Sequence, residues 1–226
     1  MTDLHGFGFA IADLELSHDQ CAYIATSLPS VADQRGGSRG LLAHPTILQL
    51  IRHRQLAQFL WSMTGRELVA VAARLLDSAS GDGRELQWHQ DCRVAVRERM
   101  DVPGYGPWTS RVGIWHVEAP SSVLNQMLVV RLCLDDSADG SGAFQILPGS
   151  HRAGKLTSGA IQQLVDTEVP VTPQVGQGSL MAMRPLLLHA ASASTVHYRV
   201  LHMEFAPLEV ISPLQWHEAV SLHRAA

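Results

Sequence analysis

The chain has 226 residues, 46% of them hydrophobic, and a formal net charge of -4. This fits one globular domain with a sizeable core, residues 1–226, and the small acidic charge gives no general attraction to nucleic acid or anionic lipid. The first residues lack a basic segment followed by an apolar stretch, and no run is long enough to cross a bilayer. We therefore expect a cytoplasmic protein, a monomer or homodimer, that acts on a small molecule.

The first part of the chain predicts a short strand followed by helices. Residues 6–12 form an apolar strand pattern. Ser17 can cap a helix, with Gln20 three residues later as in a capping box. Apolar residues at helical spacing over 44–65 predict one or two helices that end at a glycine. We expect residues 1–66 to form a helical layer.

From residue 67 to 207 the pattern is mainly that of β-strands. Short apolar segments alternate with turns rich in Gly, Pro, Asp and Ser, with one short helix over 158–165 and a loop over 113–120 near a site entrance. Many short strands after helices predict a mainly β jelly roll with N-terminal helices and a C-terminal tail over 208–226. The expected strands are 68–76, 86–91, 127–134, 143–147, 168–171, 179–183, 186–189 and 197–205.

Candidate metal ligands lie in the strand expected over 86–91. Residues i and i+2 of a strand point to the same side, so His89 and Asp91 project together. His189 is the candidate third ligand. Two histidines and one carboxylate form the facial triad of non-heme Fe(II) oxygenases. The alternative is chance, because a chain with twelve histidines can contain an H-x-D tripeptide that binds nothing.

A second candidate residue lies in the last strand, over 197–205. The alternating pattern places Arg199 on the same side as Leu201, Met203 and Phe205, which is an apolar face. A buried guanidinium without an anionic partner is costly. A ligand carboxylate held by the planar fork would satisfy it, and the alternative is a salt bridge to a distant Asp or Glu.

Four motifs in this order resemble the phytanoyl-CoA dioxygenase family of Fe(II)- and 2-oxoglutarate-dependent oxygenases. The resemblance runs from about Trp88 to Pro207, and the helical N-terminus is less diagnostic. The motifs are His89-Gln90-Asp91, Leu134-Asp135-Asp136, Leu147-Pro148-Gly149-Ser150-His151, and Arg184-Pro185-Leu186-Leu187-Leu188-His189 followed by Arg199.

The resemblance implies a double-stranded β-helix, the cupin-like form of the jelly roll. It implies that His89, Asp91 and His189 hold Fe(II) and that Arg199 holds the distal carboxylate of 2-oxoglutarate. Family members often carry a serine or threonine two residues after the second histidine, whereas this chain has Ala191. Because Asp91 is a carboxylate rather than Gly or Ala, the site is similar to that of a hydroxylase and not of a halogenase.

Five further residues are candidates for the surroundings of the iron. Gln126 and Arg131 lie on or beside an expected inner strand, where they would contact the co-substrate or the substrate. Ordinary packing of the sheet is an equal alternative for both. Trp88, Trp115 and His116 are candidates for the wall of the substrate pocket.

The function implied by the resemblance is hydroxylation of an unactivated C–H bond of a small metabolite or natural-product intermediate. O₂ and 2-oxoglutarate would be consumed, with succinate and CO₂ as co-products. One alternative is a desaturase or cyclase that uses the same oxidising chemistry. The other is a cupin-like metalloenzyme or ligand-binding protein that does not use 2-oxoglutarate.

Overall fold

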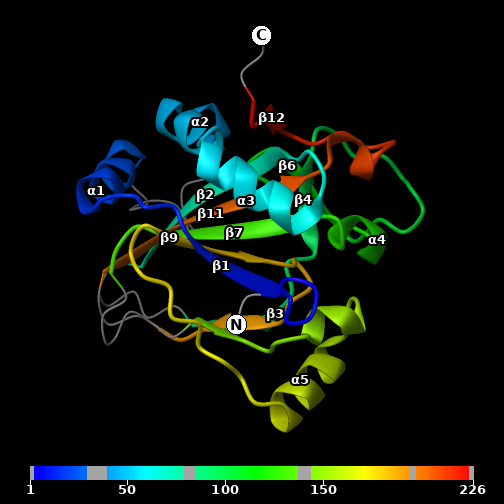
Figure 1. Cartoon of the computed structure of the whole chain (residues 1–226). Coiled ribbons are helices and arrows are strands. Elements are labelled where there is room, and N and C mark those ends of the chain that lie inside the picture. The colour runs from blue at the N-terminus through cyan, green and yellow to red at the C-terminus, as the bar shows by residue number, and fades with distance from the viewer. Residues whose placement is uncertain (1–2, 30–39, 79–84, 137–143, 194–196, 224–226) are drawn as a thin grey trace.

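A six-stranded antiparallel sheet forms the centre of the molecule, in the order β1-β9-β7-β11-β2-β12. The structure, a computed structural model, describes residues 3–29, 40–78, 85–136, 144–193 and 197–223. In Figure 1 helices α1, α2 and α3 lie on one side of this sheet, and β3 and α5 lie on the other. The six strands are β1 (Phe9–Asp13), β2 (Val69–Ser78), β7 (Leu128–Cys133), β9 (Ser179–Met183), β11 (Tyr198–Ala206) and β12 (Val220–Ser221).

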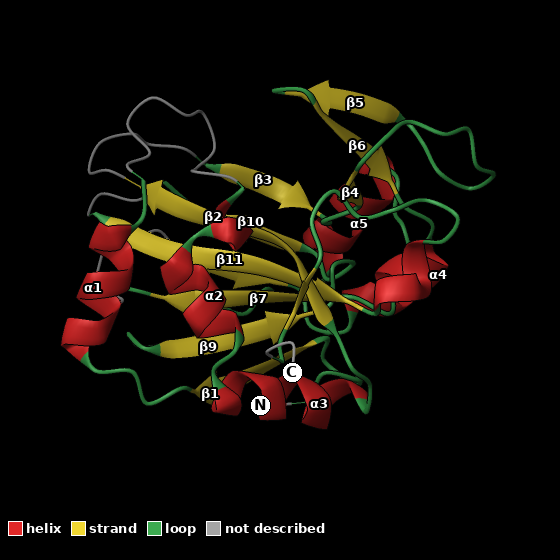
Figure 2. Cartoon of the chain, turned by 90° about the horizontal axis from the view of Figure 1, so that it is seen from above, coloured by secondary structure: helices red, strands yellow, loops and turns green. Residues whose placement is uncertain are grey.

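Two three-stranded sheets complete the β structure. The first has the order β3-β10-β8 and packs against the inner face of the large sheet. The second has the order β4-β6-β5 and lies at one end of the large sheet (Figure 2). This confirms the predicted mainly β jelly roll, a double-stranded β-helix. The strands are β3 (Leu86–His89), β10 (His189–Ala191), β8 (Phe144–Ile146), β4 (Arg93–Val96), β6 (Ile114–Glu118) and β5 (Trp108–Arg111).

Capping residues in the sequence mark the start of α1 and the end of α3. Ser17 and Gln20 form the predicted capping box of α1, and Gly65 takes the left-handed conformation (φ 62°) that ends α3. No helix in the described part of the chain is both long and apolar enough to span a membrane. The helices are α1 (His18–Ser27), α2 (Pro45–Ile51), α3 (Arg54–Thr64), α4 (Ser121–Leu124) and α5 (Ser158–Thr167), with 3₁₀ turns η1 (Leu41–Ala43), η2 (Ser150–Ala153) and η3 (Leu208–Ile211).

Both faces of the large sheet are buried. On the outer face Leu201 and Phe205 of β11 pack with Leu56 of α3 and other helical residues. On the inner face Met181 of β9 packs with Ile146 of β8. Side chains of a strand point alternately to its two faces, so odd-numbered residues of β11 face the helices and even-numbered ones face the interior of the jelly roll.

Three expected elements differ in the structure. Residues 113–120, expected as a loop, contain strand β6, which pairs with both β4 and β5. Residues 168–171, expected as a strand, contribute only the bridge from Val171 to Ile146. The apolar run 186–188 is a buried turn, and β10 begins only at His189. A short apolar run indicates burial but does not distinguish a strand from a buried turn.

The two ends of the chain also contribute to the large sheet. β1, within the region expected as a helical layer, pairs with β9 at one edge. β12, within the expected C-terminal tail, pairs with β2 at the other edge. Trp216, which precedes β12, is 3% exposed and forms a bridge to Val96 of β4. These segments therefore cover edges and sides of the β core.

Candidate metal centre

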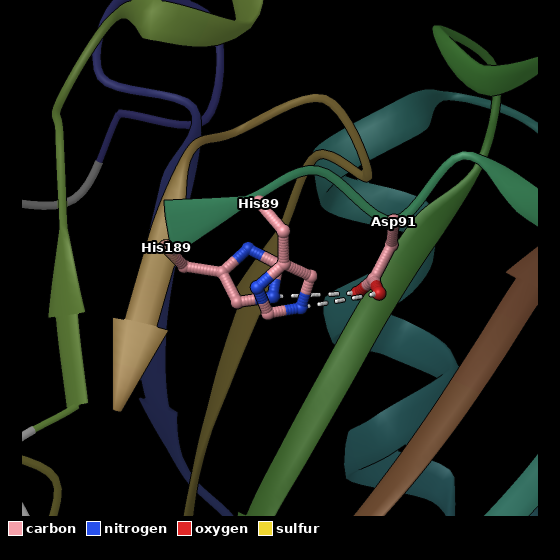
Figure 3. Close-up of side chains that lie close together, drawn as sticks. All are labelled: His89, Asp91 and His189. Atoms are coloured by element: carbon pink, nitrogen blue, oxygen red, sulfur yellow. Dashed lines mark ion pairs between the residues drawn. The ribbon is translucent and has the colours of Figure 1, made fainter. Parts of the chain in front are cut away.

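Three side chains converge between the two sheets of the jelly roll: those of His89, Asp91 and His189 (Figure 3). His89 at the end of β3 stands directly opposite His189 of β10, and their ring centroids lie 4.2 Å apart. Directly paired residues of antiparallel strands project their side chains on the same side. One ligand atom from each of the three residues lies within 4.8 Å of the others.

The two imidazoles are oriented by their own strands. Nδ1 of His89 lies 2.7 Å from the carbonyl oxygen of Gln87, and Nδ1 of His189 lies 2.9 Å from that of Leu187. A carbonyl only accepts, so each Nδ1 carries the proton and each Nε2 lone pair is available to a metal. Burial lowers the pKa of His189 to about 4, which keeps this ring neutral.

Asp91 lies just beyond the end of β3 rather than within a strand. Its backbone N–H donates to the carbonyl of Pro185 (2.8 Å), which folds the chain back toward β10. Its carboxylate oxygens lie 3.7 Å from Nε2 of His189 and 4.0 Å from Nε2 of His89, the contacts dashed in Figure 3. His89 and Asp91 thus point the same way, as predicted, but the cause is the turn of the chain after β3 rather than the alternation of a continuous strand.

The chemistry of these groups fits a divalent metal ion. Burial opposes ionisation of Asp91, but nearby basic groups, among them the cationic Arg74, outweigh it and hold the pKa of Asp91 below its ordinary value. Oδ2 of Asp91 is buried and has no hydrogen-bond partner among the described residues. Two imidazoles whose Nδ1 atoms are already engaged, one ionised carboxylate and an unsatisfied buried oxygen are what Fe(II) needs from a facial triad.

Gln90, between the two ligands, ties three backbone segments together. Its Nε2 donates to the carbonyls of Gly154 and Leu186, both at 2.8 Å, and its Oε1 accepts from the N–H of Leu156 at 2.9 Å. The H-x-D loop is thereby attached both to the turn before β10 and to the segment before α5. The sequence pattern alone indicates no role for Gln90, because its partners are distant in the chain.

We expect Gln90→Ala to reduce both stability and metal affinity. Loss of three backbone hydrogen bonds should lower the free energy of unfolding by about 2–4 kcal/mol. Because Gln90 would no longer hold the loop that carries His89 and Asp91, Mn(II) binding should weaken about ten- to hundredfold, as it does when other groups that orient metal ligands are removed. Urea denaturation and Mn(II) titration measure these effects. Gln87→Ala is the matched control, since Gln87 is exposed and holds His89 only through its backbone.

The Leu147–His151 motif holds the backbone next to His189 in place. The Leu188 N–H donates to Oγ of Ser150 (2.9 Å), and the Leu147 N–H donates to the carbonyl of Leu188 (3.0 Å). His151 is buried, with Nε2 lying 3.2 Å from the carbonyl of His5. The motif therefore fixes the backbone before His189, and His151 has a structural contact of its own.

Arg199 is not at the metal centre, and this corrects the sequence-based expectation. It lies on β11 with the odd-numbered residues, on the face covered by helices. Its Nε and Nη2 donate to the two carboxylate oxygens of Asp135 at 2.8 and 2.6 Å, and its backbone N–H donates to the same carboxylate. The apolar face was identified correctly, but the large sheet has two apolar faces and this one is the outer.

The Arg199–Asp135 pair should contribute to stability in a pH-dependent way. Burial opposes ionisation, but hydrogen bonds from Arg199 outweigh it and hold the pKa of Asp135 below its ordinary value of 3.8. A lowered pKa stabilises the folded chain above the ordinary value, and this contribution is lost as the pH falls through the lowered one.

We expect Asp135→Asn to lower the free energy of unfolding by about 1–3 kcal/mol at neutral pH, with a smaller difference below about pH 4. Urea denaturation over this pH range measures it. Asp101→Asn is the control, since its carboxylate is 88% exposed and lies 3.7 Å from Arg99. A difference between Asp135→Asn and the wild type that stays constant down to acid pH would contradict the role of ionised Asp135.

Three basic side chains in the described part of the large sheet face the interior and form a row across it. Arg74 of β2 pairs in register with His202 of β11, and His202 pairs with Arg131 of β7. All three lie on the inner face, and the pKa of Asp91 responds to Arg74 and His202. This row would be visible in the sequence only with the strand pairing known.

Arg131 lies on the side of the row nearest to His189. Its guanidinium carbon lies 3.9 Å from the ring centroid of Phe144, and that ring lies 5.5 Å from the ring of His189. Burial lowers the pKa of Arg131, and the charge of Asp91 raises it. Within the described residues Arg131 forms no ion pair with a carboxylate. Of the two further residues that the sequence offered as contacts of the co-substrate or substrate, Gln126 and Arg131, it is Arg131 that lies beside the triad.

The other candidates separate into two groups. His116 of β6 faces the cavity beside the triad, with its Nδ1 3.1 Å from the carbonyl of Ile114. Trp115 points to the other side of β6, where it packs edge-on against Trp108. Gln126 donates to the carbonyl of Ser122 and accepts from Arg66.

Trp88 precedes His89 in β3, so its side chain points to the opposite face of that strand. The cavity that the described residues form beside the triad is therefore not lined by Trp88, Trp115 or Gln126. His116 and Arg131 remain as candidates near the metal centre.

A cavity of about 760 Å³ opens beside the triad. His89 and Asp91 form part of its inner wall, with Arg74 and Glu204 from the large sheet. Lys155 lies 3.3 Å from the Glu118 carboxylate on the same wall. This volume is that of a site for a small molecule rather than for a polymer.

Comparisons with known proteins agree with this geometry. The structure is similar to that of AviO1 from Streptomyces viridochromogenes Tue57, with a TM-score of 0.63 and 20% identity over 90% of this chain and 91% of that one. It is also similar to EctD from S. alaskensis with 2-oxoglutarate and 5-hydroxyectoine (TM-score 0.66, 15% identity, 91% and 74% covered). A third similar structure is SnoK, a non-heme alpha-ketoglutarate-dependent carbocyclase from nogalamycin biosynthesis (TM-score 0.66, 12% identity, 91% and 81% covered).

These likenesses show the shared fold. No curated protein sequence matches the chain. A sequence profile described as phytanoyl-CoA dioxygenase (PhyH) matches residues 38–200, which contain all three residues of the triad. The chain therefore belongs to the phytanoyl-CoA dioxygenase family of Fe(II)- and 2-oxoglutarate-dependent oxygenases.

Proposed function

We propose that the chain hydroxylates an unactivated C–H bond of a small metabolite or natural-product intermediate, consuming O₂ and 2-oxoglutarate and releasing succinate and CO₂. The carrying observation is the convergence of His89, Asp91 and His189 with their metal-binding atoms turned toward one another. Among similar structures, that of EctD was solved with 2-oxoglutarate and a hydroxylated compound, 5-hydroxyectoine. The intact carboxylate at position 91 supports hydroxylation as the reaction.

The charges around the triad support 2-oxoglutarate as the co-substrate. Near the iron ligands, the guanidinium of Arg131 adds one positive charge and the carboxylate of Asp91 adds one negative charge, whereas Arg74 lies 4.0 Å from its own carboxylate neighbour, Glu204. A bound Fe(II) would leave a surplus of two positive charges in a largely buried space. Burying unbalanced charge is costly, and 2-oxoglutarate is a dianion. Charge balance thus favours a dicarboxylate over a neutral or monoanionic co-substrate.

Each residue near the triad has a distinct role in this proposal. His89, Asp91 and His189 would hold the metal on one side and leave its other positions open. Arg131, supported by the ring of Phe144, takes the role expected of Arg199 and binds the distal carboxylate of 2-oxoglutarate. Bound Fe(II) supplies the activation of O₂ that oxidises the substrate. The cavity walls hold the substrate C–H bond beside it and exclude water.

Release of CO₂ from carboxyl-labelled 2-oxoglutarate, with Fe(II) and ascorbate, tests the proposal without the substrate being known. We expect the wild type to release CO₂ and form succinate in amounts that depend on Fe(II). His89→Ala should lose this activity, whereas His53→Ala, at the N-terminus of α3, should retain it. Equal turnover in His89→Ala and the wild type would reject the assignment of the triad.

A further inference from the structure

One wall of the cavity carries a buried donor that has no acceptor. Arg74 extends from the inner face of β2 and lines the cavity together with Asp91 and Glu204. Its Nε is buried and has no hydrogen-bond partner among the described residues. Its Nη2 lies 4.0 Å from the carboxylate of Glu204, which is too far for a hydrogen bond. The Arg74 side chain therefore lines the cavity and keeps one buried donor without an acceptor among the described residues.

His202 fixes the position of this guanidinium. Nη2 of Arg74 lies 2.8 Å from Nε2 of His202. A guanidinium only donates, so Nε2 accepts and the neutral ring carries its proton on Nδ1. That Nδ1 is also buried without a partner in the described part of the chain, and His202 is only 2% exposed. Buried donors are almost always paired, so two such neighbours indicate an acceptor that comes from outside the chain.

The surroundings define the charge of that acceptor. Glu204 lies near Arg74, and Asp91 and Glu118 line the same cavity. These carboxylates repel a dianion such as phosphate, whereas one guanidinium with a free Nε–H suits a single negative charge. Two other cations of the cavity wall are engaged, because Arg93 and Lys155 both contact Glu118, at 3.6 and 3.3 Å, and Arg111 lies on the exposed strand β5.

We propose that Arg74, positioned by His202, binds a carboxylate of the substrate, so that the substrate class is small monocarboxylic acids. This rests on the proposed function, because it places the acid beside an iron centre that already holds 2-oxoglutarate. The two carboxylate sites are separate: Arg131 packs on Phe144 behind His189, while Arg74 lines the open cavity beside Asp91. Arg74 selects the substrate, and Arg131 holds the co-substrate.

The test uses isotope-labelled full-length chain loaded with diamagnetic Zn(II), with and without 2-oxoglutarate. Proton–nitrogen spectra record the arginine Nε–H signals, which burial protects from exchange with water. Arg74→Lys and Arg131→Lys assign the two signals. Sodium acetate is titrated to about 100 mM against sodium chloride at equal ionic strength, a range that covers one charge-assisted contact. Sodium phosphate forms a second titration.

We expect acetate, but not chloride, to move the Arg74 signal saturably, and phosphate to bind at least about tenfold more weakly. 2-Oxoglutarate should move the Arg131 signal and leave acetate binding at Arg74 intact. The matched control Arg93→Met removes a paired cation of the same cavity and should keep the acetate response.

Three results would overturn the proposal. The Arg74 signal could respond alike to acetate and chloride, phosphate could bind as tightly as acetate, or 2-oxoglutarate could displace acetate from Arg74. The last result would assign Arg74 to the co-substrate. If instead 2-oxoglutarate moved neither signal while acetate still moved that of Arg74, the proposed function would fail and the monocarboxylate site would stand.

Discussion

Asp91→Asn should yield a folded chain that no longer binds Fe(II) or Mn(II) and forms no succinate. Asparagine has nearly the shape of aspartate but lacks the negative charge that a divalent ion needs between two neutral imidazoles. Loss of groups that merely orient metal ligands costs about ten- to hundredfold in affinity, so loss of a ligand charge should exceed a hundredfold. Isothermal titration with Mn(II) under anaerobic conditions measures this directly.

Thermal unfolding separates metal loss from misfolding. Mn(II) stabilises only a state that binds it, so it should raise the melting temperature of the wild type and leave that of Asp91→Asn unchanged. Asp101→Asn, at an exposed carboxylate, should respond to Mn(II) like the wild type. An Asp91→Asn chain that still gains stability from Mn(II) would mean that the ion is bound elsewhere.

Arg131→Gln should raise the Kd of 2-oxoglutarate by at least about thirtyfold. Removing one partner of a buried, hydrogen-bonded charge pair costs about 2–5 kcal/mol. Arg131→Lys keeps the charge but loses the planar fork, so its Kd should lie between those of the wild type and Arg131→Gln. Titration of the Mn(II)-loaded chain with 2-oxoglutarate gives these constants without turnover.

Arg199→Gln is the matched comparison, because it makes the same chemical change on the outer face of the sheet. Its Kd for 2-oxoglutarate should equal that of the wild type, while its free energy of unfolding should fall through loss of the contacts to Asp135. The opposite pattern, a weakened Kd in Arg199→Gln and an unchanged one in Arg131→Gln, would restore the expectation from the sequence.

Local patterns predicted much of the fold. The capping residues of α1, the glycine that ends α3 and the apolar segments of β2, β7 and β9 each depend on neighbours in the chain. Strand β6 and the turn over 186–188 were assigned wrongly, because their conformation depends on distant partners. β6 becomes a strand through its pairing with β4 and β5, which a local pattern does not contain.

The candidate site shows the same division. His89, Asp91 and His189 form a recognisable motif, and the structure brings them together. The arginine was placed wrongly, because alternation in β11 assigns Arg199 to an apolar face without saying which of two apolar faces holds the metal. Arg131 and Arg74 are separated along the chain and become neighbours of His202 only through strand register.

Strand β11 therefore lets an engineer change two properties independently. Its odd-numbered side chains contact the helices, so substitutions at positions such as Leu201 should alter thermal resistance. Of its even-numbered side chains, Glu204 lines the cavity and His202 contacts Arg74 on the cavity wall, so changes at these two positions should alter substrate choice. Mutant libraries that vary only the odd-numbered or only the even-numbered positions of this nine-residue strand would therefore change either thermal stability or substrate selectivity.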